Sequence, residues 1–211
     1  MYSLVRWITK PRINKKILNL ILRGRSHAMF ADISPFFARP KRILDVGAGT
    51  CNTTEVLRNE GYNVIPLDVI DFSIVDGIRP LLYDGANMPF KIGAFDLAVV
   101  LTTLHHAIDV ERVLAETTRV SKKIIIIEDV YKNWLHKYAT WWLDSLINLE
   151  FVGHPHNNKC DRDWRALFER LGLELLAVKQ RWSLGIMWQL TYNLAQPGVE
   201  PISSIPAYIS E

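Results

Sequence analysis

Two apolar segments separated by a helical one constrain the fold of this chain more than any other feature. Residues 94–101 read AFDLAVVL and residues 122–129 read KKIIIIED. Runs this rich in valine and isoleucine are typical of strands buried on both faces, as in a parallel sheet. Between them, residues 108–120 carry apolar side chains at helical spacing. The chain is therefore predicted to contain a strand–helix–strand crossover.

The same alternation continues on both sides of this crossover. Further strands are predicted at residues 42–46, 63–69, 80–84, 173–180 and 186–196. Helices are predicted at residues 53–61 and 161–172, the second capped by Asp161 and closed by Gly172. The last two strands are joined by a short connection, so we expect them to be antiparallel to each other. The pattern favours the α/β class, with a doubly wound, mostly parallel sheet.

The 211 residues have room for one such domain. We place it at residues 41–196, between an N-terminal helical extension at residues 1–40 and a tail at residues 197–211 that is expected to be loose. Cys51 and Cys160 lie far apart in sequence and match no disulfide or C-x-x-C pattern. A cytoplasmic location is therefore expected.

The N-terminal extension is strongly basic. Residues 1–42 hold ten Lys or Arg and one acid, whereas the rest of the chain holds fifteen Lys or Arg and twenty-one acids. Its longest apolar run, ILNLIL at residues 17–22, is far shorter than the about 20 residues that a bilayer span needs. Two interpretations stay open: an amphipathic helix that covers one edge of the domain, or a helix in peripheral contact with an anionic membrane.

An aromatic insertion interrupts the alternation at residues 130–160. Long connections at the carboxyl ends of parallel strands commonly form lids or substrate walls. We therefore expect a lid here, with Trp141, His154 and His156 contacting the substrate. The spacing of these histidines and Cys160 fits no common zinc pattern, so no metal site is predicted.

A glycine turn follows the first predicted strand in RILDVGAGTCN, residues 42–52. Gly47 and Gly49 fit a dinucleotide fingerprint, but Asn52 stands where its third glycine belongs. No phosphate-cradling G-x-x-x-x-G-K sequence is present. Asp45, two residues before Gly47, would repel a pyrophosphate and attract a cation. The turn is thus predicted to hold a ligand that carries positive charge.

Four motifs, in order and at the right spacing, resemble the class I S-adenosylmethionine-dependent methyltransferases, in the branch known as methyltransferase type 11. They are DVGAGTC (45–51), an acid at Asp68, YDGANMPF (83–90) and FDLAVVLTTLHHAID (95–109). The chain departs from the family pattern at Cys51, which replaces a glycine, and at residues 121–123, where SKK replaces Pro-Gly-Gly. The resemblance implies a seven-stranded Rossmann-like fold and S-adenosylmethionine as cofactor.

The resemblance also implies roles for individual residues. Asp68 would bind the ribose hydroxyls, Asp84 would face the adenine amino group, and Gly85 and Ala86 would line the adenine ring. The full set of implied cofactor contacts is Asp45, Gly47, Ala48, Gly49, Asp68, Val69, Asp84, Gly85, Ala86 and Leu101.

Two histidines follow the fourth predicted strand, beside the expected position of the transferred methyl group. Imidazoles titrate near neutrality, so His105 or His106 could accept a proton from a hydroxyl or carbon acid. A positioning or structural role for the pair is an equal alternative, because such pairs occur in the resembling family with many substrates.

The sequence predicts a methyltransferase that acts on a small-molecule or lipid-like acceptor. Nucleic acid is disfavoured as a partner, because TTLHH (102–106) lacks the Asn/Asp-Pro-Pro-aromatic pattern of base-modifying enzymes and no recognition module is evident. Two alternatives remain, a cofactor-binding interaction module without catalysis and a nicotinamide-dependent oxidoreductase. The acceptor atom and the oligomeric state stay open.

Overall fold

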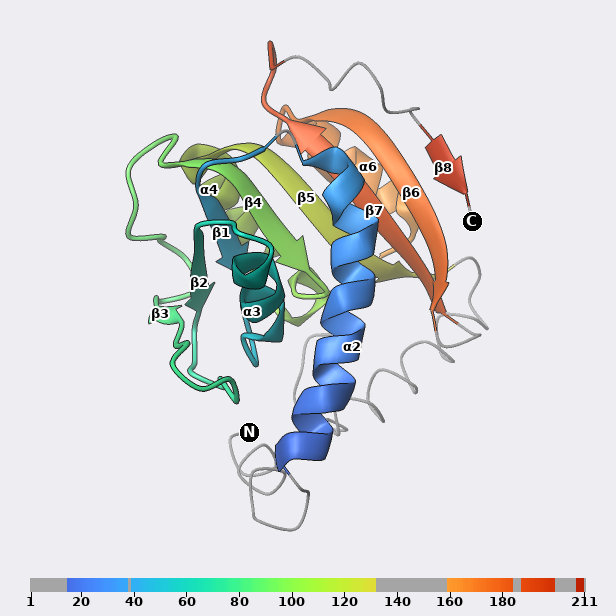
Figure 1. Ribbon diagram of the computed structural model, residues 1–211. Helices are drawn as coiled ribbons and strands as arrows, with labels where there is room; N and C mark the ends of the chain where they lie inside the picture. The colour runs from blue at the N-terminus through green and yellow to red at the C-terminus, as the bar shows by residue number, and fades with distance from the viewer. Residues whose placement is uncertain (1–14, 38, 132–158, 184–186, 200–207, 211) are drawn as a thin grey trace.

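The computed structural model describes residues 15–37, 39–131, 159–183, 187–199 and 208–210 (Figure 1). Its helical elements are α2 (Lys15–Ile33), η1 (Ser34–Phe36), α3 (Asn52–Asn59), η2 (Leu104–His106), α4 (Val110–Val120) and α6 (Asp161–Arg170). Its strands are β1 (Ile43–Val46), β2 (Val64–Asp68), β3 (Leu81–Leu82), β4 (Phe95–Leu101), β5 (Ser121–Val130), β6 (Glu174–Ser183), β7 (Met187–Ala195) and β8 (Tyr208–Ser210).

One sheet contains all these strands, in the order β3-β2-β1-β4-β5-β7-β6-β8. The strands from β3 to β5 pair in parallel, and β7 is antiparallel to both β5 and β6. In this register the end of β1, at Val46, lies beside Leu67 of β2 and Val100 of β4. The turns after β1, β2 and β4 therefore meet at one edge, called here the carboxyl edge, where open α/β sheets bind ligands.

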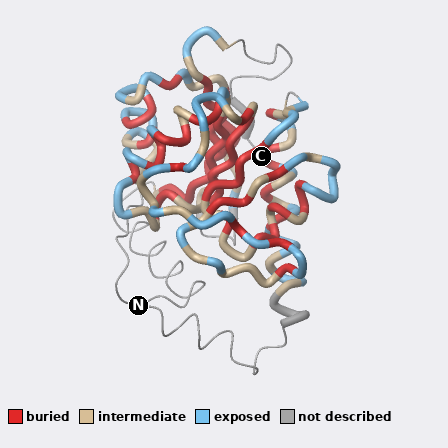
Figure 2. Tube along the Cα trace, turned by 90° about the vertical axis from the view of Figure 1, so that its left-hand side faces the viewer, coloured by how far each residue is buried: buried red, intermediate tan, exposed pale blue. Residues whose placement is uncertain are grey.

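The sheet is covered by helices on both faces. One buried cluster joins α2, η1 and α3 to one face, and includes Met29, Phe36 and Leu57. The larger cluster joins α4 and α6 to the opposite face, with Leu114 and Trp164 fully buried. Figure 2 shows the strands as the buried centre between these layers. The doubly wound, mostly parallel α/β fold is thus confirmed.

Helix α2 is fixed to the domain by polar contacts at both ends. Near its start, Asn19 accepts a hydrogen bond from Asn52 Nδ2 at the beginning of α3 (2.5 Å). Near its end, buried Asp32 lies 3.2 Å from Lys179 Nζ and 2.6 Å from Arg181 Nε, both on β6. The basic extension therefore contains a helix that packs across the sheet, as Figure 1 shows.

Three sequence expectations differ from the structure. The strand predicted at residues 80–84 has only two residues, Leu81 and Leu82. Asp161 does not cap α6, because the capping position is Cys160 and makes no side-chain hydrogen bond; Asp161 instead pairs with Arg165 and accepts a hydrogen bond from Tyr192 Oη. Within the tail expected to be loose, residues 208–210 form β8, which pairs in parallel with β6.

Candidate functional site

The glycine turn after β1 is shaped by a close approach to the turn after β4. Gly47 has φ 71°, and a Cβ atom there would lie 2.1 Å from Thr103 Cγ2. The hydroxyl of Thr103 can donate its one proton to the carbonyl of Leu101 (3.1 Å) or to that of Gly47 (3.3 Å), and Gly47 N donates a hydrogen bond to the Leu67 carbonyl of β2 (2.8 Å). Only glycine fits this position, and the contact ties the two turns into one unit.

Cys51 stands where the resembling family has a third glycine, and its backbone explains that preference. Its φ is 62°, in the left-handed region that suits glycine, and its side chain is fully buried. Burial raises the pKa of the Cys51 thiol to about 11. The thiol is therefore protonated at neutral pH and serves as apolar packing under the turn, next to Ala48, Val75 and Ile78.

Asp68 lies at the end of β2 with its carboxylate aimed at the glycine turn. Its Oδ2 accepts a hydrogen bond from Gly49 N (2.7 Å), and its Oδ1 accepts one from Val69 N (2.7 Å). Burial raises the pKa of Asp68, and the backbone hydrogen bonds oppose that shift. Oδ1 also accepts a longer bond from Ile70 N (3.4 Å), so the remaining acceptor capacity of the half-buried carboxylate lies mainly on Oδ2, which is suited to accept a ribose hydroxyl.

Asp45, one of the predicted cofactor contacts, is buried against α3. Its side chain is 2% exposed, and its Oδ2 accepts a hydrogen bond from Thr54 Oγ1 on α3 (2.6 Å). Burial raises the pKa of Asp45 to about 6, although the Thr54 hydrogen bond lowers it. The carboxylate therefore fixes α3 beneath the turn.

The loop after β3 is organised by Asp84. Its Oδ1 accepts hydrogen bonds from the backbone N–H groups of Ala86 (2.8 Å) and Asn87 (2.6 Å). A hydrogen bond from the Asn87 side chain, with these two backbone bonds, lowers the pKa of Asp84 to about 2. Arg112 Nε of α4 donates a hydrogen bond to the Ala86 carbonyl (2.9 Å), which fixes the loop to α4. Gly85 has φ 81° and faces Val69, to whose Cγ1 an added Cβ would come within 3.2 Å.

The histidine turn, η2, is held by a buried carboxylate that the sequence analysis missed. Glu128 of β5 accepts hydrogen bonds from Thr103 N (3.1 Å) and Leu104 N (2.7 Å) through Oε1. Its Oε2 lies 2.7 Å from His105 Nδ1. Glu128 is fully buried and His105 is 2% exposed. An acid in an otherwise apolar strand, close to its carboxyl end, is the signal that could have revealed Glu128.

The two histidines differ in access to solvent. The ring centroids of His105 and His106 lie 4.0 Å apart, with an interplanar angle of 47°. His105 is buried against Glu128, whereas His106 is half-buried. A carboxylate can only accept, so its contact favours the tautomer of His105 that carries the proton on Nδ1.

The predicted residues thus divide into two groups. Those for the cofactor gather at the carboxyl edge, where Leu101 ends β4 and is 7% exposed. Trp141, His154 and His156, with most of the predicted lid, lie outside the described residues. Within the part of the chain that the structure describes, no group of three His, Cys, Asp or Glu side chains could hold a metal ion.

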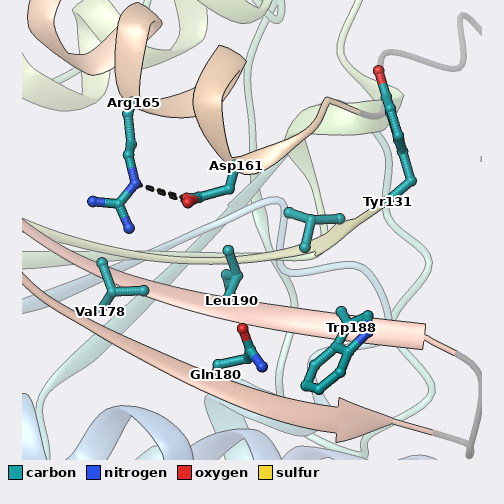
Figure 3. Close-up of a pocket in the computed structure, with 8 residues that line it drawn as sticks. Tyr131, Asp161, Arg165, Val178, Gln180, Trp188 and Leu190 are labelled. Carbon is teal, nitrogen blue, oxygen red and sulfur yellow. Dashed lines mark hydrogen bonds and ion pairs between the residues drawn. The ribbon is translucent and has the colours of Figure 1, made fainter. Parts of the chain in front are cut away.

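A separate cavity of about 170 Å³ opens where β5 leads into the predicted lid (Figure 3). Its lining is mixed, with an ion pair between Asp161 and Arg165 on one side and Trp188 on the other. None of the predicted cofactor or histidine residues lines it. It lies on the α6 face of the sheet, and it therefore does not serve as the cofactor cleft.

Comparison with known proteins agrees with this arrangement. A family model described as a methyltransferase domain matches residues 44–124, from the second residue of β1 to the fourth residue of β5. Residues 44–124 therefore match the methyltransferase domain of the type 11 branch, and this match supports assignment to the class I S-adenosylmethionine-dependent methyltransferases. The match includes the glycine turn, Asp68, Asp84 and the histidine turn, and the cofactor of this methyltransferase is S-adenosylmethionine.

Solved structures share the fold of this methyltransferase at low sequence identity. A methyltransferase from Methanosarcina mazei is 17% identical, with TM-score 0.62, over 78% of this chain and 97% of its own. Magnesium protoporphyrin IX methyltransferase from Synechocystis, solved with S-adenosylhomocysteine, is 15% identical, with TM-score 0.61, over 92% and 94%. The [4+2]-cyclase SpnF is 13% identical, with TM-score 0.61, over 81% and 80%. A search of curated proteins finds no match.

Proposed function

We propose that this methyltransferase transfers the methyl group of S-adenosylmethionine to a small-molecule or lipid-like acceptor that loses a proton during the reaction. The observation that carries the proposal is the close approach of Gly47 to Thr103, where a Cβ added at Gly47 would lie 2.1 Å from Thr103 Cγ2. Through it the cofactor turn and the histidine turn are fixed to each other, so an imidazole is held beside the place where the methyl group is transferred.

The carboxyl-edge residues would divide the binding of S-adenosylmethionine among them. Asp68 would accept the ribose hydroxyls, Asp84 would face the adenine amino group, and Val69, Gly85 and Ala86 would enclose the adenine ring. Asp45 would stabilise the turn from below, because it is buried against Thr54. The open backbone at Gly47 and Gly49 leaves room for the ligand where a side chain would fill it.

The cofactor supplies an activated methyl group on a sulfonium. In the transfer, the acceptor atom would bond to the methyl carbon as the carbon–sulfur bond breaks, and the electron pair of that bond would stay on sulfur. A hydroxyl or carbon acceptor also loses a proton. The half-buried His106 would take that proton, and buried His105, oriented by Glu128, would keep the neighbouring ring in place.

The proposal is tested by the destination of a labelled methyl group. The full chain would be incubated with methyl-labelled S-adenosylmethionine and a metabolite extract divided into aqueous and organic-soluble fractions. We expect label in one fraction, and less of it with His106→Ala while S-adenosylhomocysteine binding by calorimetry is retained. Cofactor binding without transfer in any fraction would contradict the proposal and favour the non-catalytic alternative.

The test is needed because the fold alone does not fix the reaction: SpnF, which shares the fold, is named as a cyclase.

A further inference from the structure

Large apolar side chains are exposed mainly at one edge of the molecule. The exposed set is Leu20, Ile21, Val69, Leu81, Leu82, Ile92, Ile108 and Trp182. Val69 directly follows β2, Ile108 follows η2, and Trp182 is next to the last residue of β6. All three positions belong to the carboxyl edge, and Leu81 and Leu82 pair with the last two residues of β2 beside it. Only Ile92, shortly before β4, lies at the opposite edge among the described residues.

Helix α2 brings basic charge to the same edge. Asn19 is bonded to Asn52, which follows the glycine turn, and Arg25 donates to Thr102 Oγ1, which follows β4. The first half of α2 therefore lies at the carboxyl edge and extends past it, as Figure 1 shows. On this half, Leu20 is 72% exposed and Ile21 is 64% exposed, and exposed Arg23 and Arg25 follow within one turn. Arg23 also forms an ion pair with Glu55 (3.7 Å) but stays partly accessible.

We propose that the carboxyl edge docks on an anionic membrane surface, with Leu20 and Ile21 entering the bilayer interface and Arg23 and Arg25 contacting lipid headgroups. A helix that combines apolar and basic side chains on its exposed surface is the pattern of interfacial binding. Charge complementarity selects this occupant, since residues 1–25, up to and including this half of α2, hold seven Lys or Arg and no acid. A nucleic acid would use the charges and leave the two exposed apolar side chains in water.

The docking surface also narrows the class of acceptor, and this step rests on the proposed methyl transfer. His106 lies in η2, and exposed Ile108 follows it by two residues at the same edge. A domain docked through this edge turns the mouth of the site toward the lipid. The acceptor is thus an amphiphile that resides in the membrane and presents its hydroxyl or acidic carbon at the interface.

Flotation of the full chain with vesicles tests the docking. We expect binding to phosphatidylcholine vesicles that contain phosphatidylglycerol, weaker binding to phosphatidylcholine alone, and a loss with rising salt. The double variant Leu20→Ser/Ile21→Ser should partition at least about tenfold less, because two apolar side chains no longer leave water. The control Ile92→Ser removes an equally exposed apolar side chain, 79% exposed, from the opposite edge and should bind like the parent chain.

Three results would overturn the docking: equal binding to both vesicle types, unchanged binding of the double variant, or equal loss with Ile92→Ser. Calorimetry with S-adenosylhomocysteine separates this failure from a failure of the proposed function. Intact cofactor binding and methyl transfer to a water-soluble acceptor, without vesicle binding, would reject the membrane surface alone. Absence of methyl transfer in every fraction, with vesicle binding intact, would reject the proposed function alone.

Discussion

His105 Nδ1 lies 2.7 Å from Glu128 Oε2, and both side chains are buried between η2 and β5. The same carboxylate receives the backbone N–H groups of Thr103 and Leu104. One charge therefore fixes the turn, the ring orientation and the tautomer of a histidine at the carboxyl edge. This arrangement joins the stability of the site to its proposed chemistry.

Replacing Glu128 with Gln should loosen the histidine turn. In the parent chain the donors of Thr103, Leu104 and His105 share two carboxylate oxygens, whereas the amide offers them one oxygen and carries no negative charge. We therefore expect a loss of about 2–3 kcal/mol in the free energy of unfolding. Urea denaturation measures that loss, and nitrogen NMR of the His105 ring should show less of the Nδ1-protonated tautomer. The exposed control Glu111→Gln should change neither quantity. An unchanged tautomer would contradict the assigned contact.

Gly47→Ala should abolish cofactor binding. The new Cβ would collide with Thr103 Cγ2, 2.1 Å away, and with its Oγ1 at 2.6 Å, so the two turns must separate. Gly77→Ala is a matched control, because Gly77 also has positive φ (76°) but nothing lies within 4 Å of an added Cβ. Calorimetry with S-adenosylhomocysteine should show no binding for the first variant and near-normal binding for the second. Equal effects would mean that backbone strain, and not the collision, matters.

The left-handed backbone at Cys51 should make its glycine variant more stable than its alanine variant. Cys51→Ala removes the buried thiol and keeps the strained φ of 62°, whereas Cys51→Gly removes the thiol and relieves the strain. Left-handed backbone costs a non-glycine residue about 1 kcal/mol or more, so the Gly variant should be more stable than the Ala variant by about that amount. Denaturation of the three proteins in urea gives the ranking. An Ala variant as stable as the Gly variant would show that the backbone is unstrained.

Replacing buried Asp129 with a neutral side chain should raise the free energy of unfolding in a pH-dependent way. Burial raises its pKa to about 6, against 3.8 in the unfolded chain, while His105 and Arg25 lower it and Glu128 raises it further. Because the folded value is the higher one, the side chain destabilises the fold progressively as pH rises from 3.8 to about 6, and fully above that. Asp129→Asn should therefore add up to about 3 kcal/mol of stability near pH 8, and little near pH 4. Urea denaturation at both pH values checks this. A gain that is equal at both would contradict ionisation as the cause.

Much of the fold follows from the sequence, and the reasons are local. The Val/Ile-rich runs at residues 94–101 and 122–129 match β4 and β5 closely, because strands buried on both faces need continuous apolar side chains. The two-residue β3 and the edge strand β8 have no such run, since an edge strand is specified by its neighbour as much as by its own residues. The strand at residues 80–84 was therefore predicted too long, and β8 was not predicted.

The candidate site was predictable where the backbone itself forms it. Gly47 and Gly49 indicate a turn with positive φ, and Asp68 follows at the end of the next strand. The bond between Glu128 and His105 joins residues 23 positions apart, and only the pairing of β4 with β5 brings them together. Likewise, sequence placed Asp45 near the ligand, but whether its carboxylate faces the ligand or α3 depends on Thr54, nine residues away.

The central claim is that the turn after β1 and the carboxylate of Asp68 together bind the adenosyl group of S-adenosylmethionine. Isothermal titration calorimetry of the full chain with S-adenosylhomocysteine, and in parallel with NAD, tests it most directly. We expect saturable binding of S-adenosylhomocysteine and no binding of NAD. Asp68→Asn keeps the size of the side chain and removes the charge that receives the ribose hydroxyls, so it should bind S-adenosylhomocysteine at least about tenfold more weakly. Tight binding of NAD with no heat from S-adenosylhomocysteine would contradict it.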